Sequence, residues 1–154
     1  MTRRLFLVQA ACLPVVALAD SAEDAWDEVA AMAAALAEDN ASGFLKRFDK
    51  DMPGYQELES KVTALLQQAD VESHISALAN DGGPAERTLQ LDWQLRMKPK
   101  GFVTPLSDEP QRHSGDQRLD EREEAVTIVL RRDGKKWHAR KLEPIAFFAP
   151  PNFR

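Results

Sequence analysis

The feature that most constrains the fold is a strict alternation of apolar and polar residues over residues 88–98. Its apolar members are Leu89, Leu91, Trp93, Leu95 and Met97, each separated from the next by a polar residue. Because successive side chains of a strand point to opposite faces, this alternation predicts a β-strand with one buried and one solvated face. Such a strand is typical of an antiparallel sheet that other elements cover on one side only.

Further strands are predicted before and after this segment. Residues 71–79 also fit a strand, with Val71, Ser73, Ile75 and Ala77 on one side. The turn signal at 80–84 separates this strand from residues 88–98. Residues 123–132 and 135–142 predict two strands joined at Asp133-Gly134, a strong two-residue hairpin signal. Residues 99–119 contain several prolines and glycines, so we expect a long, mobile loop there.

The chain before these strands has helical periodicity instead. Residues 21–38 place Trp26, Val29, Ala33 and Leu36 on one face, and Ser21 is the expected N-cap. A short second helix after Asn40 is expected to bury Phe44, Leu45 and Phe48. A third helix follows the turn at 49–54 and is expected to bury Leu58, Val62, Leu65, Leu66 and Ala69. Three helices followed by an antiparallel sheet predict a two-layer α+β domain.

Residues 1–19 have the composition of a cleavable export signal. Arg3 and Arg4 precede an apolar stretch, residues 5–19, that is shorter than the about 20 residues a membrane span needs. The stretch ends in Ala17-Leu18-Ala19, so we predict cleavage after Ala19 and a single domain over residues 20–154. Residues 2–7 resemble a twin-arginine signal, and the general secretory route remains an alternative. We therefore expect a periplasmic or secreted protein with no membrane span after cleavage.

Charge and cysteine content narrow the classes of partner. The chain has a net charge of −5, and its only cysteine, Cys12, lies within the predicted signal. Disulfides and cysteine-ligated metals are therefore excluded from the rest of the chain. The basic residues at 131–136 flank the predicted hairpin turn, where we expect them to be solvated. Because nucleic-acid binding depends on clustered positive charge, we expect no nucleic-acid partner.

Few residues have the spacing of a catalytic or metal site. The three histidines, His74, His113 and His138, lack metal-ligand spacing, so we expect neither a metal nor a cofactor. Asp92 alternates with the apolar row of its strand and is expected to face away from the helices. His74 and His138 lie on predicted strands and are the candidates for a general base, although a histidine in a strand is more often structural.

The order of these elements resembles the nuclear transport factor 2-like superfamily, a cone-shaped fold that includes the SnoaL-like proteins. The segments that carry the resemblance are residues 25–49, 64–78, 87–97, 123–144 and 145–151. More narrowly, the chain is similar to exported bacterial members of unknown function. The superfamily usually inserts a strand hairpin before its third helix, and residues 49–54 leave no room for one. We therefore expect a shallower cone, with a curved antiparallel sheet of about four strands.

The resemblance and the one-sided strand together suggest a non-enzymatic binding module for an apolar small ligand or a protein partner. The candidate pocket residues are Trp26, Leu65, Trp93, Trp137, Phe147 and Phe148. Filling a core is the more common role of such aromatic side chains, and we favour it for Trp93, Trp137, Phe147 and Phe148. We also expect a homodimer through the outer face of the sheet. The alternatives are a SnoaL-like isomerase, dehydratase or hydrolase with His74 or His138 as base, and a structural envelope protein.

Overall fold

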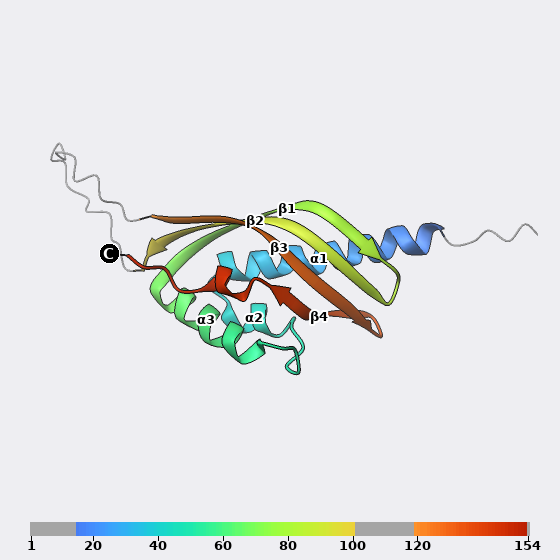
Figure 1. Cartoon of the computed structure of the whole chain (residues 1–154), viewed down its shortest axis with the longest axis horizontal. Helices are drawn as coiled ribbons and strands as arrows, with labels where there is room; N and C mark the ends of the chain where they lie inside the picture. The colour runs from blue at the N-terminus through green and yellow to red at the C-terminus, as the bar shows by residue number, and fades with distance from the viewer. Residues whose placement is uncertain (1–14, 101–118, 154) are drawn as a thin grey trace, which may run out of the picture.

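The structure is a computed structural model that describes residues 15–100 and 119–153. The predicted signal up to residue 14, His113 and nearly all of the predicted loop lie outside the described residues. The elements, drawn in Figure 1, are α1 (Val15–Ala37), α2 (Ala41–Leu45), α3 (Tyr55–Gln68), β1 (Ala69–Gly82), β2 (Glu86–Pro99), β3 (Asp120–Asp133), β4 (Lys136–Glu143) and the short 3-10 helix η1 (Ile145–Phe148).

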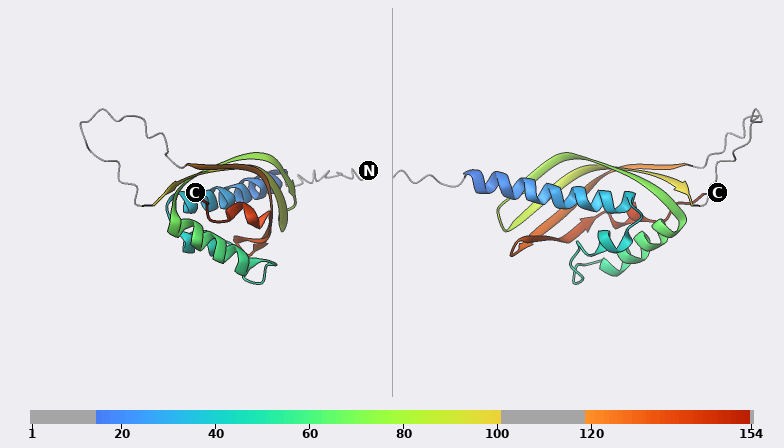
Figure 2. Two further views of the ribbon diagram at one scale, coloured as in Figure 1. Left: turned by 60° about the vertical axis from the view of Figure 1, so that its left-hand side comes forward. Right: turned by 180° about the vertical axis from the view of Figure 1, so that it is seen from behind.

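The strands form one antiparallel sheet in the order β1-β2-β3-β4. Figure 2 shows the sheet curving around α1, with α2, α3 and η1 on the open side of the curve. The predicted α+β architecture, three helices on a four-stranded sheet, is confirmed. As expected, α3 leads directly into β1, and no hairpin lies between α2 and α3. No helix among the described residues is long and apolar enough to cross a membrane.

Strand β2 has the predicted two faces. Its five alternating apolar side chains are at most 1% exposed, whereas Gln90, Gln94 and Arg96 are exposed. In β1, Val71, Ser73, Ile75 and Ala77 share one face as predicted, and their pairing with inward residues of β2 shows that it is the inner face. Burial declines along this row, and Ala77 is exposed. The reason is that β1 is an edge strand whose register shifts by a bulge at Leu78.

Two local predictions were wrong. The β3–β4 hairpin turns at Gly134-Lys135, one residue later than predicted, with Asp133 paired to Lys136. Two-residue hairpin turns favour a positive φ at their first central residue, and Gly134 has a φ of 62°. Ser21 is not the N-cap of the first helix, because α1 already begins at Val15. Asn40, by contrast, caps α2 by accepting a hydrogen bond from the Gly43 backbone N–H at 2.8 Å.

Ser21 instead helps to attach α1 to the sheet. It is 1% exposed, and its Oγ accepts a long hydrogen bond of 3.5 Å from Nη1 of the buried Arg87 on β2. Asn80 on β1 accepts from Arg87 Nε at 2.7 Å and donates to the Ala22 carbonyl at 3.0 Å. These contacts hold α1 against the end of the β1–β2 hairpin that is next to its turn.

Candidate functional site

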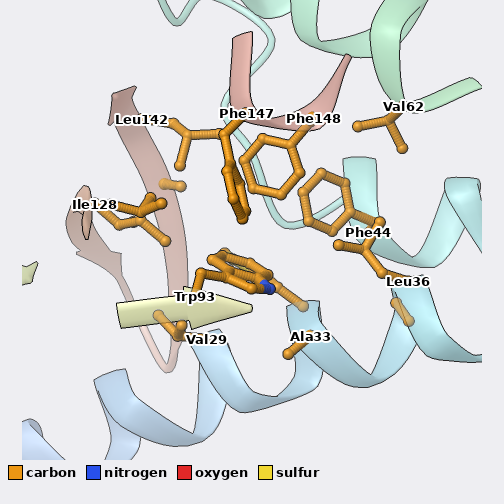
Figure 3. Close-up of a cluster of buried hydrophobic side chains, with 14 of the residues drawn as sticks. Val29, Ala33, Leu36, Phe44, Val62, Trp93, Ile128, Leu142, Phe147 and Phe148 are labelled. Atoms are coloured by element: carbon orange, nitrogen blue, oxygen red, sulfur yellow. The ribbon is translucent and has the colours of Figure 1, made fainter. Parts of the chain in front are cut away.

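An aromatic cluster fills the space between the concave face of the sheet and the helices (Figure 3). Trp93 comes from β2, Phe44 from α2, and Phe147 and Phe148 from η1. The Trp93 and Phe148 rings meet edge to face at 5.1 Å, and Phe148 lies 5.5 Å from Phe44. Phe147 lies 6.3 Å from Trp93. These separations fall in the range of favourable aromatic pairs, so the four rings form one packed unit.

The polar edge of Trp93 is also satisfied. Its indole N–H donates to Ser73 Oγ on the neighbouring strand at 2.8 Å, while the side chain itself is fully buried. A buried tryptophan N–H normally needs such an acceptor, and the bond fixes how the ring lies in the interior. Trp137 differs, because its buried Nε1 has no hydrogen-bond partner in the described part of the chain.

The two phenylalanines belong to a segment that pairs with no strand. Residues 144–151, which we call the C-terminal strap, follow β4 after a cis bond between Glu143 and Pro144. The strap carries η1, which contacts α3. Phe147 and Phe148 are buried, whereas Ala149 and Pro150 are partly exposed. The strap thus contributes interior side chains to the core without being part of the sheet.

One arginine connects the strap to the sheet. Arg122 lies on the inner face of β3, where it pairs with the buried Leu95, and its side chain is 22% exposed. Its Nη1 donates to the carbonyls of Phe147 and Ala149 at 3.0 and 2.6 Å. Its Nη2 donates to Asp120 Oδ2 at 3.0 Å and to the Pro150 carbonyl at 3.3 Å. A single guanidinium therefore accounts for three contacts to the strap backbone.

The structure brings together most of the predicted pocket residues. Trp93, Phe147 and Phe148 are in mutual contact, and Leu65 and Trp137 are buried in the same apolar core. Trp26 is partly buried and packs against that core from α1. Sequence reasoning missed Phe44 as a member of the aromatic cluster, and it also missed Ser73 and Arg122. No sequence signal identified the role of Arg122, because its inward direction follows only from the pairing register of β2 and β3.

The two candidate histidines lie on the other face of the sheet. His74 is exposed and pairs with Gln94, and His138 is half-buried and pairs with Arg131. Asp92 also lies on this outer face, as predicted. None of the three side chains points towards the aromatic cluster. The described residues contain no group of three or more side chains suited to holding a metal ion.

A groove of about 350 Å³ lies at the end of the sheet where β2 and β3 are joined by the undescribed residues. Its outer-face lining includes Glu72, His74, Gln94, Arg96, Glu121 and Glu123, and it reaches Arg122. Arg96 Nε lies 2.9 Å from Glu121 Oε1, and its Nη1 lies 3.6 Å from Glu72 Oε2. The groove is therefore a charged feature of the outer face, on the opposite side of the sheet from the aromatic cluster.

A curved antiparallel sheet with three helices against its concave face defines the nuclear transport factor 2-like fold. No protein-family model and no curated protein matches the sequence. Solved structures do match, and their similarity shows that this chain has the nuclear transport factor 2-like fold.

One is a nuclear transport factor 2-like protein of unknown function from Shewanella oneidensis, with a TM-score of 0.54, 9% identity and coverage of 78% of this chain and 94% of that chain. A provisionally assigned dehydratase of that family from Streptomyces avermitilis has a TM-score of 0.56 and 10% identity, covering 80% and 94% of the two chains. A protein of unknown function from Mycobacterium tuberculosis has a TM-score of 0.63 and 10% identity, covering 86% and 75%. Likeness at these identities establishes the fold and leaves the activity open.

Proposed function

We propose that the protein is an exported, non-enzymatic binding module that takes up an apolar small molecule between the sheet and the helices. The observation that carries this proposal is the way the interior is filled. Phe147 and Phe148, two of the rings packed around Trp93, belong to a strap that forms no strand pairing. A ligand that displaces the strap would meet a surface of aromatic and aliphatic side chains, the usual lining of a small-molecule site.

The strap is suited to displacement because few directed bonds hold it. Its link to β3 is the Arg122 guanidinium, and its two rings are held by non-directional apolar contacts. An apolar ligand replaces such contacts with contacts of the same kind, so the exchange costs little interaction energy. The fold is compatible with small-molecule recognition, since the Streptomyces avermitilis neighbour is provisionally assigned as a dehydratase.

Binding without chemistry is the favoured role because of where the candidate bases lie. His74 and His138 are on the outer face, on the opposite side of the sheet from the aromatic cluster. A general base must lie within hydrogen-bond reach of the proton that it removes. A ligand held against Trp93 would be separated from both imidazoles by the sheet itself.

The proposal is tested by titrating the protein with 1-aminoanthracene, a neutral apolar dye whose fluorescence rises in an apolar site. We expect saturable binding at one site per chain. Phe148→Leu should tighten binding by roughly threefold to tenfold, since the smaller side chain leaves space that the dye can fill. Phe148→Ala should tighten it further if thermal unfolding shows that this variant remains folded.

The matched control is Leu78→Ala. Leu78 is 59% exposed in the β1 bulge and is the most exposed large apolar side chain among the described residues. If the dye binds this surface residue, Leu78→Ala will weaken the fluorescence signal and Phe148→Leu will leave it unchanged. That pair of results would refute the proposed interior site.

A second candidate function is protein binding at the outer face, where the sequence suggests a homodimer. The groove favours it, because Arg96 lies between Glu72 and Glu121 while Glu123 lines the same groove. Alternating charges of this kind allow a two-fold contact in which carboxylates of each copy meet the arginine of the other. Sedimentation equilibrium should show a dimer that Arg96→Glu dissociates, and a monomer at all concentrations would refute it.

A further inference from the structure

We infer that Arg122 binds the head group of the ligand in the proposed interior site, and that the preferred ligand carries a neutral carbonyl group on an apolar body. The inference rests on the proposed function, and it adds which polar group recognises the ligand and what chemistry that group selects. It follows from what the strap supplies to the pocket: two aromatic rings for the interior, and carbonyl oxygens for the guanidinium.

The acceptors that Arg122 now uses are mostly neutral. Among the described residues it makes four hydrogen bonds: three go to the backbone carbonyls of Phe147, Ala149 and Pro150, and the fourth goes to the Asp120 carboxylate. The three carbonyls belong to consecutive or nearly consecutive residues of the strap. They therefore leave together when the strap moves.

A ligand that replaces the strap must satisfy the same donors. The Arg122 side chain is 22% exposed, so most of the side chain is shielded from solvent. Leaving donors of a charged, mostly buried group without acceptors is costly, and the cost falls on any ligand that offers none. A purely apolar molecule replaces Phe147 and Phe148 but not the carbonyls. A molecule with a carbonyl head group on its apolar body replaces both.

The charges around Arg122 favour a neutral head group over a carboxylate. Asp120 already compensates the guanidinium at 3.0 Å. An anionic ligand would gain charge compensation that Asp120 already provides, and its carboxylate would lie close to the Asp120 carboxylate. A ketone, ester or amide avoids this repulsion and offers the acceptor that the strap offers now.

The test compares three probes with the same apolar body at neutral pH: 4-phenylbutanamide, 4-phenylbutanoate and butylbenzene. Each displaces 1-aminoanthracene from the full-length protein in a competition titration. We expect the amide to bind at least threefold to tenfold more tightly than butylbenzene, and the carboxylate to bind more weakly than the amide. In Arg122→Met the advantage of the amide over butylbenzene should disappear. The matched control, Arg131→Met, removes an exposed arginine from the outer face of the same strand and should leave that advantage intact.

A second measurement covers the case in which Arg122→Met fails to fold. In the wild-type protein the Arg122 Nε–H nuclear magnetic resonance signal should shift with the amide and much less with butylbenzene. Tighter binding of the carboxylate, or an amide advantage that survives in Arg122→Met, would overturn the inference. If butylbenzene binds and the amide has no advantage, the inference fails and the interior site stands. If none of the probes displaces the dye, both fail together.

Discussion

At the scale of single residues, two polar side chains make hydrogen bonds at the apolar interior, and the two bonds have different roles. Ser73 accepts the Trp93 indole N–H and removes the only polar demand of a fully buried ring. Arg122 keeps a charged group at the edge of the same interior and satisfies it with strap carbonyls. The first contact fixes a ring in place. The second contact is made to the strap, the segment that a ligand would displace in the proposed function, and its acceptors are backbone atoms outside the sheet.

Tyr55 allows a test of the electrostatics of α3 at the same scale. Burial raises the pKa of the Tyr55 phenol above its ordinary value of 10.0, and the charge of Glu59 and a hydrogen bond with that residue raise it further. Tyr55 is the only tyrosine of the chain, so phenolate absorbance in an alkaline titration reports this residue alone. We expect Glu59→Gln to lower the midpoint. Glu57→Gln, which removes a carboxylate paired with Lys61 instead, should not change it.

The same pKa shift predicts the direction of a stability change. Because the folded-state pKa lies above the unfolded-state value, the contribution of the protonated phenol is fully present below pH 10 and is lost as the pH rises through the folded-state pKa. The free energy of unfolding of the wild-type protein should therefore fall more steeply above pH 10 than that of Tyr55→Phe. Equal slopes in urea titrations of the two proteins would contradict the shift.

At the scale of elements, the start of α3 packs closely against the strap. Gly54 precedes α3 with a φ of 80°, a conformation that side chains rarely adopt. A Cβ atom at this position would collide with the Ile145 side chain of η1. Gly54→Ala should therefore lower the free energy of unfolding by about 1–3 kcal/mol, from backbone strain and from the displaced strap.

Gly83→Ala is the control for this prediction. Gly83 lies in the β1–β2 turn, where an added Cβ has no neighbour within 4 Å. Its unfolding midpoint in urea should stay close to that of the wild-type protein. Equal effects of the two substitutions would show that the contact between α3 and the strap contributes little.

Sequence patterns predicted elements better than they predicted junctions. The alternation in β2 and the helical face of α3 depend on burial alone, and both appear in the structure, except that the buried Ala69 begins β1 instead of ending α3. The β3–β4 turn was displaced by one residue, since the positive φ of Gly134 settles which pair closes the hairpin. Arg122 lies in the polar run at the start of β3 and looks solvated in sequence. Only its pairing with Leu95 directs it to the inner face.

At the scale of the whole molecule, the residues just after the predicted cleavage point attach α1 to the sheet. Ser21 and Ala22 are bonded to Arg87 and Asn80, whereas the first turns of α1 project beyond the sheet (Figure 1). Cleavage after Ala19 would therefore leave these contacts in place, which supports the proposal of an exported domain. The resulting domain would have no cysteine, so its stability would depend on the core that the strap completes.

The proposed interior site involves the whole molecule, because the sheet, the helices and the strap all contribute side chains to the core in which a ligand would replace the strap. The most direct measurement is an intermolecular nuclear Overhauser experiment with bound butylbenzene. The chain has three tryptophans, whose indole N–H signals are assigned by single Trp→Phe variants. We expect contacts from the probe to the Trp93 indole, together with weaker contacts between Trp93 and Phe148. Probe contacts confined to outer-face residues such as His74, with the Trp93–Phe148 contact unchanged, would contradict the interior site.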